Sequence, residues 1–119
     1  MATGKGRVLF IARFDGDVTE LIRAYDRGHA LIMSRGGAVS FGELRHHCAT
    51  SEHSLYIIDV WESEAHVRRR WFSEELKATL TSVGFPAPDQ AAITILDLHA
   101  IEPPLQPPAS STAGSTTPR

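Results

Sequence analysis

The chain of 119 residues lacks several features that would place it in a familiar class at once. Its only cysteine, Cys48, cannot form a disulfide within the chain. Lys and Arg number 12 against 14 acidic residues, so there is no excess of positive charge to indicate nucleic-acid binding. No apolar run approaches the length of a membrane span, and the N-terminus has no apolar segment of signal-peptide length. We therefore expect a soluble cytoplasmic protein without nucleic-acid or membrane partners.

Large apolar residues are almost absent after Ile101. Segment 102–119 consists mostly of Pro, Ser, Thr, Ala and Gly, and Leu105 is its only large apolar residue. Such a segment cannot bury enough surface to offset the entropy that it would lose on ordering. The sequence therefore predicts a folded domain over residues 1–101 and a disordered tail over residues 102–119.

The hydrophobic pattern of the domain predicts two helices and four strands. Asp17 can cap the first helix, which runs to about Ser34 before two glycines end it. Ser63 can cap the second helix, which we expect to run as one piece to Gly84. A short polar turn joins the second and third strands into a hairpin. The strands are expected over residues 6–14, 41–50, 54–61 and 92–101.

This order of elements, βαββαβ, is that of the ferredoxin-like fold, an α+β arrangement of a four-stranded antiparallel sheet with two helices on one face. Segments 8–11 and 55–58 are apolar at every position, so both faces of the sheet must be buried. The helices can cover only one face. For so short a chain, a second copy is the simplest cover for the other face, which predicts a homodimer.

Histidines within otherwise apolar elements are the main chemical signal of the sequence. His29 lies on the apolar face of the first helix, with Tyr25 one turn before it. His46 and His47 alternate along the second strand, so only one of them can face the helices. His99 lies in the last expected strand. Since an imidazole titrates near neutral pH, these positions indicate a pocket that can accept and donate protons.

Two carboxylates lie on strands close to these imidazoles. Asp59 shares a strand face with Trp61, and Asp97 shares one with His99. A buried charge without a partner is costly, so each carboxylate needs an imidazole or a hydrogen bond across the dimer. A pocket that combines imidazoles with carboxylates can also hold a metal ion.

Several segments resemble the antibiotic-biosynthesis monooxygenase-like superfamily of dimeric α+β barrel proteins. They are the stretch IIDVWESEAH at 57–66, the pair Trp71-Phe72, the stretch GFPAP at 84–88 and the closing strand with His99. The first helix, with Tyr25, Asp26 and His29, resembles the Tyr-Asp-x-x-His helix of an actinobacterial-type branch of that group. In that branch a strand histidine often stands where His47 stands here. The resemblance covers most of residues 8–101.

The resemblance implies a dimeric barrel with one pocket per subunit, but the superfamily carries out several kinds of chemistry. We expect a cofactor-independent, monooxygenase-like enzyme that acts on a small hydrophobic molecule, aromatic or polyketide-like. A histidine would remove an acidic proton, and the resulting anion would be oxygenated, cyclised or isomerised. The alternatives are a non-catalytic binding or accessory protein and a His-ligated metal enzyme. The expected catalytic residues are His29, His47 and His99, and the expected substrate-binding residues are Tyr25, Asp59 and Trp61.

Overall fold

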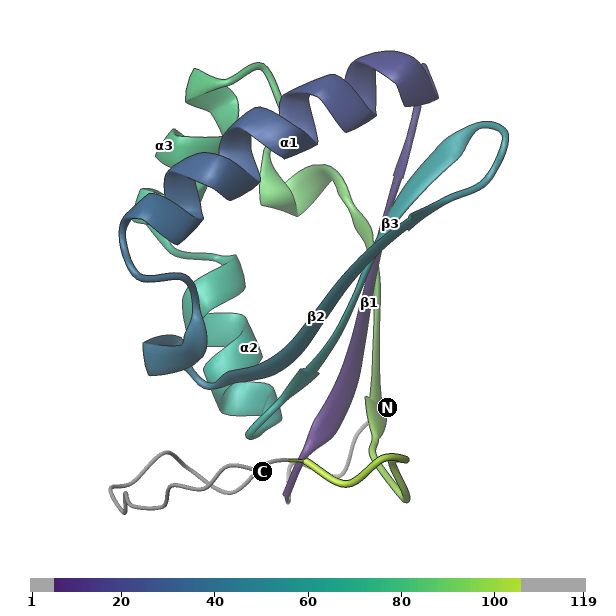
Figure 1. Ribbon diagram of the computed structural model, residues 1–119, viewed down its shortest axis with the longest axis vertical. Helices are drawn as coiled ribbons and strands as arrows, with labels where there is room; N and C mark the ends of the chain where they lie inside the picture. The colour runs from purple at the N-terminus through teal and green to yellow at the C-terminus, as the bar shows by residue number, and fades with distance from the viewer. Residues whose placement is uncertain (1–5, 106–119) are drawn as a thin grey trace, which may run out of the picture.

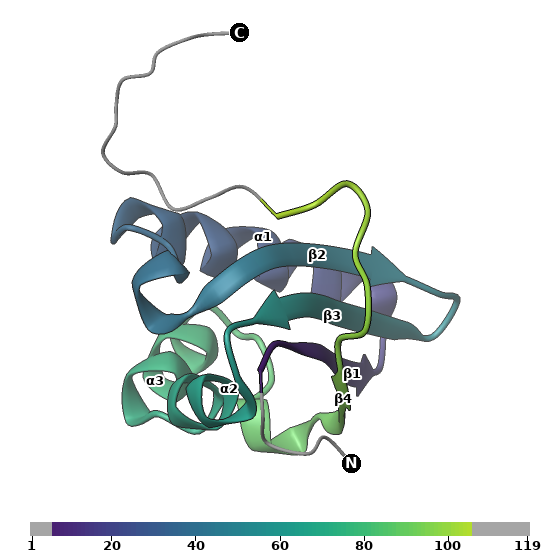
Figure 2. The same ribbon diagram turned by 90° about the horizontal axis from the view of Figure 1, so that it is seen from below.

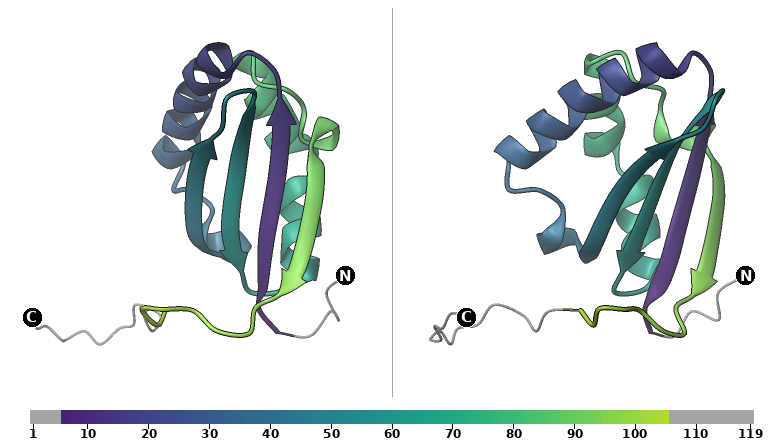
Figure 3. Two further views of the ribbon diagram at one scale, coloured as in Figure 1. Left: turned by 90° about the vertical axis from the view of Figure 1, so that its right-hand side faces the viewer. Right: turned by 45° about the vertical axis from the view of Figure 1, so that its right-hand side comes forward.

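Four antiparallel strands form one sheet in the computed structural model, which describes residues 6–105 (Figure 1). The order of the strands across the sheet is β2-β3-β1-β4. This arrangement, with the helices on one face of the sheet (Figure 3), is the ferredoxin-like α+β fold that the sequence predicts. The strands are β1 (Val8–Asp15), β2 (Glu43–Thr50), β3 (Ser54–Trp61) and β4 (Ala92–Asp97).

Three α-helices and two 3₁₀ turns connect the strands. They are α1 (Val18–Ser34), η1 (Val39–Phe41), α2 (Glu64–Trp71), α3 (Glu74–Ser82) and η2 (Pro88–Gln90). The cap expected for the first helix is present, because the Asp17 carboxylate accepts a hydrogen bond from the Glu20 backbone N–H at 3.0 Å. Gly36 and Gly37 follow the helix with positive φ angles of 102° and 73°. Among residues 6–105, no helix combines the length and the apolar character needed to cross a bilayer.

The second predicted helix is in fact two helices, and this prediction is wrong. The Ser73 side chain accepts a hydrogen bond from the Leu76 backbone N–H, which makes Ser73 the cap of a new helix, α3. Ser73 itself has an extended backbone, with φ −74° and ψ 147°, so the helical path is interrupted there. As a consequence Trp71 is buried in the core, whereas Phe72 is 50% exposed.

The last strand is shorter than predicted. It ends at Asp97 rather than Ile101, and the following Leu98 N–H bonds to the Arg7 carbonyl at 3.0 Å. The chain then crosses the ends of the other strands (Figure 2), and the Arg45 guanidinium donates to the Pro103 carbonyl at 2.8 Å. Residues 102–105 thus lie against the start of β2. The rest of the tail expected over 102–119 lies outside the described residues.

The hydrophobic core lies between the sheet and the helices. The side chains of β1 that face the helices, Val8, Phe10, Ala12 and Phe14, are at most 2% exposed. Phe10 packs edge-on against the Trp71 ring, with 4.8 Å between ring centroids. Alternate side chains of β1 point to the other face of the sheet, which carries none of the described helices (Figure 3).

Candidate active site

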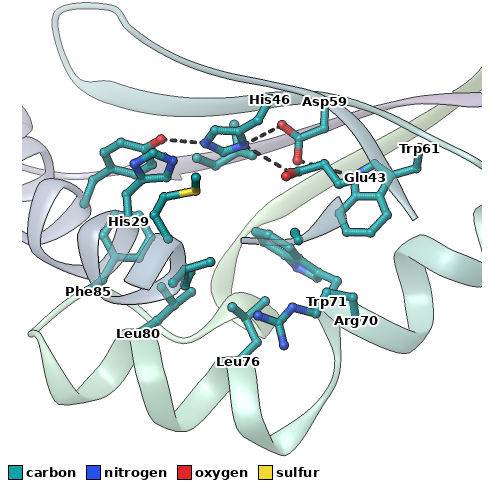
Figure 4. Close-up of a pocket in the computed structure, with 15 residues that line it drawn as sticks. His29, Glu43, His46, Asp59, Trp61, Arg70, Trp71, Leu76, Leu80 and Phe85 are labelled. Atoms are coloured by element: carbon teal, nitrogen blue, oxygen red, sulfur yellow. Dashed lines mark hydrogen bonds and ion pairs between the residues drawn. The ribbon is translucent and has the colours of Figure 1, made fainter. Parts of the chain in front are cut away.

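A cavity of about 90 Å³ lies between the β2–β3 side of the sheet and the helices (Figure 4). One part of its lining is polar or charged, with Tyr25, His29, Glu43, His46, Asp59 and Arg70. The remaining lining is apolar or aromatic and includes Trp61, Trp71, Leu76, Leu80 and Phe85. A largely apolar lining with a few convergent polar groups is the usual lining of a small-molecule site.

The register of β2 against β3 decides which histidine enters the cavity. His46 pairs with Asp59, whose side chain faces the helices, so His46 faces them too. His47 pairs with Ile58 on the opposite face, where it is exposed and its Nδ1 lies 2.8 Å from the Ile58 carbonyl oxygen. The choice of His47 as the pocket histidine is therefore wrong, and His46 takes that position.

His46 is held by two carboxylates at one ring nitrogen. Its Nδ1 lies 2.8 Å from Asp59 Oδ1 and 3.2 Å from Glu43 Oε2. The second oxygen of Asp59 accepts a hydrogen bond from the Trp61 indole N–H at 3.3 Å. Asp59 is almost fully buried, with 3% of its side chain exposed. Both oxygens of this buried carboxylate thus have partners, which fixes its orientation and that of the imidazole.

These contacts change the protonation of the pair. Burial of the His46 ring opposes its charge, but the hydrogen bonds and negative charges of Asp59 and Glu43 outweigh burial and raise the pKa of His46 to about 10. Burial also raises the pKa of Asp59, against the opposing effect of the His46 hydrogen bond. At neutral pH His46 is therefore an imidazolium whose Nδ1–H donates to the two acidic side chains.

The other nitrogen of His46 meets a phenol. His46 Nε2 lies 2.5 Å from the Tyr25 hydroxyl oxygen, so Asp59, His46 and Tyr25 form one continuous hydrogen-bonded chain. Burial raises the pKa of the Tyr25 phenol, and the negative charge of Asp59 adds to this. The phenol stays neutral, and when His46 is an imidazolium Tyr25 accepts its Nε2–H and keeps its own proton for another acceptor.

His29 is stacked on this chain. Its ring lies nearly parallel to Tyr25, at 5.4 Å between centroids and an angle of 12°, and to His46, at 5.2 Å and 9°. Among residues 6–105, no hydrogen bond involves the His29 ring. The structure therefore places a half-buried imidazole in the cavity whose two nitrogens are not bonded to the described protein.

Two other predicted site residues lie outside the cavity. His99 is exposed and follows the end of β4, and Asp97 is exposed at that end. Of the histidines expected to act together, only His29 lines the cavity, so His29, His47 and His99 do not converge on one metal. Tyr25, Asp59 and Trp61, the residues expected to bind substrate, do line it.

Sequence reasoning missed Glu43 and Arg70. Glu43 and His46 are three residues apart, which would place them on opposite faces of a regular strand. A register shift between Glu43 and Arg45 adds a residue to β2 and brings both side chains to the same face. Glu43, His46 and Asp59 are also the described residues with a metal-ligand geometry, since their ligand atoms all lie within 4.8 Å of one another.

Solved structures of other proteins have a similar fold. No family model matches the chain, and no curated protein matches it in sequence. SnoaB from Streptomyces nogalater, a cofactor-independent oxygenase, is 19% identical, with a TM-score of 0.57 over 84% of this chain and 100% of that one. Rv0793 from Mycobacterium tuberculosis is 18% identical, with a TM-score of 0.56 over 81% of this chain and 98% of that one.

A third structure belongs to a protein from Caulobacter crescentus CB15 that has been proposed to be an antibiotic biosynthesis monooxygenase. It is 15% identical, with a TM-score of 0.56 over 82% of this chain and 92% of that one. The chain has the fold of the antibiotic-biosynthesis monooxygenase-like proteins, which confirms the resemblance seen in the sequence at the level of the fold.

Proposed function

We propose that the protein is a monooxygenase-like enzyme that needs no cofactor and begins its reaction by removing a proton from a small molecule. The observation that carries this proposal is the His29 imidazole, which lines the cavity and makes no hydrogen bond to the described residues. A general base must reach the proton that it removes, and its accepting nitrogen must be free. His29 meets both conditions, whereas both nitrogens of His46 are occupied.

Tyr25 and His46 would stabilise the anion that His29 creates. When a proton leaves a carbon next to a carbonyl, the electron pair moves to the carbonyl oxygen. The Tyr25 hydroxyl can donate to that oxygen while it accepts from the His46 imidazolium, which places a positive charge one hydrogen bond away. Hydrogen-bond donors that are already in place stabilise a developing negative charge strongly in a cavity that excludes most water.

The anion then has two courses. It can add dioxygen at carbon to give a peroxide anion, which takes back the proton from His29 to form a hydroperoxide, and loss of water leaves a carbonyl. It can also cyclise or isomerise without oxygen. The likeness in fold to SnoaB, a cofactor-independent oxygenase, supports the first course. The rival is a non-catalytic binding or accessory protein that uses the same cavity.

The size of the cavity bears on the substrate. A cavity of about 90 Å³ is smaller than the roughly 150 Å³ of an engineered cavity that holds benzene. The cavity therefore holds only part of a substrate, such as one β-dicarbonyl unit of a polyketide-like molecule. A larger aromatic or polyketide-like compound would extend outward past Met33, which lines the cavity and is 56% exposed.

Deuterium exchange in heavy water separates proton removal from oxygenation. A panel of β-dicarbonyl and phenolic compounds is incubated with the protein without oxygen, and loss of the acidic C–H signal is followed by NMR. Oxygen uptake is measured in parallel. We expect exchange to fall 100-fold to 10,000-fold in His29→Gln, the usual range for loss of a general base.

His47→Gln is the matched control, because His47 is an exposed histidine on the sheet face away from the cavity. It should exchange at the parent rate. Exchange that is unchanged in a folded His29→Gln, or binding of panel compounds without any exchange, would favour the accessory protein instead.

We propose a homodimer as the assembly, formed through the sheet face that lacks helices. Its centre is apolar and incompletely buried in one chain, with Leu9, Ile11, Tyr56, Ile58 and Leu96. Leu96, near the end of the edge strand β4, is 43% exposed and extends this apolar patch. Light scattering should give twice the chain mass, and a stable monomer at micromolar concentration contradicts the proposal. With Cys48 unpaired, we place this dimer in the reducing cytoplasm.

A further inference from the structure

Arg70 is a buried cation in the wall of the cavity that the proton transfer described above does not use. It belongs to α2, and only 8% of its side chain is exposed. Figure 4 shows its guanidinium beside Trp71 and Leu76, on the side of the cavity away from His29. A charged group in such a place needs a partner of opposite charge, because desolvation is costly.

The partners that the protein supplies are weak. Arg70 Nη1 lies 3.3 Å from Glu75 Oε1, a long contact, and 62% of the Glu75 side chain is exposed. The face of the guanidinium rests on the Phe41 ring, at 4.1 Å from its centroid. The contact with Glu75 uses one of the five N–H donors of the guanidinium, and the contact with the Phe41 ring uses none.

The remaining donors point to open space. Among residues 6–105, no fully buried side-chain nitrogen or oxygen lacks a hydrogen-bond partner. The Arg70 nitrogens that are not bonded to Glu75 must therefore reach accessible volume. Arg70 lines two such volumes, the cavity itself and an outer cleft of about 380 Å³ that also includes Phe41, His66 and Ser73.

We infer that Arg70 binds the carboxylate of the substrate, so that the substrate class is a short β-keto carboxylate. This inference rests on the proposed function. A planar carboxylate can take two parallel hydrogen bonds from the guanidinium fork. Glu43 and Asp59 already hold the His46 imidazolium, so Arg70 is the cation of the cavity lining with donors left for a substrate carboxylate. The substrate is thus oriented with its charge at Arg70 and its ketone toward Tyr25 and His29.

A pair of probes with the same shape tests the charge. Acetoacetate carries the carboxylate, and acetoacetamide is its neutral analogue. The chain has two tryptophans, and both Trp61 and Trp71 line the cavity, so their indole N–H signals report binding in an NMR titration. We expect acetoacetate to shift the Trp71 signal and to bind about tenfold or more tightly than acetoacetamide, as a charge-assisted pair requires.

Three variants complete the test. Arg70→Met should reduce acetoacetate affinity to that of acetoacetamide, while Arg68→Met, which removes an exposed neighbouring arginine, should leave it unchanged. Glu75→Gln removes the competing protein carboxylate and should raise acetoacetate affinity a few-fold. If Arg70 only held the helices together, Glu75→Gln would lower stability and leave affinity as it is. That readout stands even if Arg70→Met fails to fold.

Equal binding of the two probes, no binding of acetoacetate, or shifts confined to the outer cleft at His66 would each overturn the inference. A failure of the Arg70 inference can be told apart from a failure of the proposed enzymatic function. Proton exchange that depends on His29 but occurs equally with both probes removes the role of Arg70 and keeps the enzyme. Charge-selective binding without exchange keeps Arg70 and removes the enzyme.

Discussion

β1 and β2 present opposite kinds of side chain to the same layer of helices. The helix-facing residues of β1 are apolar and at most 2% exposed, as at Phe10. Those of β2 are Glu43, His46, Cys48 and Thr50, which are polar or small and less buried. β1 lies inside the sheet with a strand on each side, whereas β2 is an edge strand. The central strand therefore forms the core, and the edge strand supplies the polar wall of a cavity.

The largest expected effect is a difference between the two strands in how much a substitution lowers the free energy of unfolding. Phe10→Ala should lower the free energy of unfolding by about 3–5 kcal/mol, because it leaves a hole beneath the Trp71 ring. Cys48→Ala, at a helix-facing position of β2, should cost less than about 1.5 kcal/mol. Denaturant unfolding measures both values. Losses of equal size would mean that the edge strand is part of the same tightly packed core.

The next effect is a pH dependence at the polar wall. His46 has a pKa raised to about 10 in the folded protein, so the folded state holds a proton that the unfolded state releases near pH 6.5. The stabilisation is complete below about pH 6.5 and is lost as the pH rises toward about 10. The stability of the parent should therefore fall between about pH 6.5 and 8.5, and this slope should disappear in the double variant His46→Gln/Asp59→Asn, which leaves neither the imidazole nor the buried Asp59 carboxylate to take up the proton. A slope that persists in the variant would assign the proton to another group.

A smaller effect is expected one residue further along β2. His47→Gln should change the free energy of unfolding by no more than about 0.5 kcal/mol, because His47 is exposed on the other face. Its pH dependence should match that of the parent. If His47→Gln instead removes the slope and the double variant keeps it, the register of β2 against β3 is shifted by one residue.

The smallest expected effect is that of a chelator. Glu43, His46 and Asp59 have ligand atoms close enough for a metal, but the Nδ1 proton of His46 already links the two carboxylates. We expect EDTA to leave the melting temperature unchanged. Stoichiometric zinc, iron or manganese in elemental analysis that is lost in Glu43→Gln would contradict this prediction. It would show that a metal ion, rather than the Nδ1 proton, links the three side chains.

Prediction from sequence succeeded where the signal was local. The α1 cap at Asp17 and the order βαββαβ follow from spacing over a few residues, and the structure confirms both. It failed where two local signals competed, as at Ser73, whose capping side chain divides a continuous helical pattern into α2 and α3. The prediction also extended the last strand to Ile101, past His99, because apolar composition does not mark where pairing with β1 ends.

The sequence by itself determined the ferredoxin-like layers and placed Tyr25 and His29 one turn apart on a helix face that meets the sheet, because helical periodicity is a property of the chain alone. Only the tertiary structure decided between His46 and His47, since segment 43–50 has no apolar alternation to set its phase. Pairing with β3 set that phase, and the irregularity after Glu43 turned a second carboxylate toward the imidazole. The cavity and its electrostatics thus depend on contacts between residues far apart in sequence, which no local pattern records.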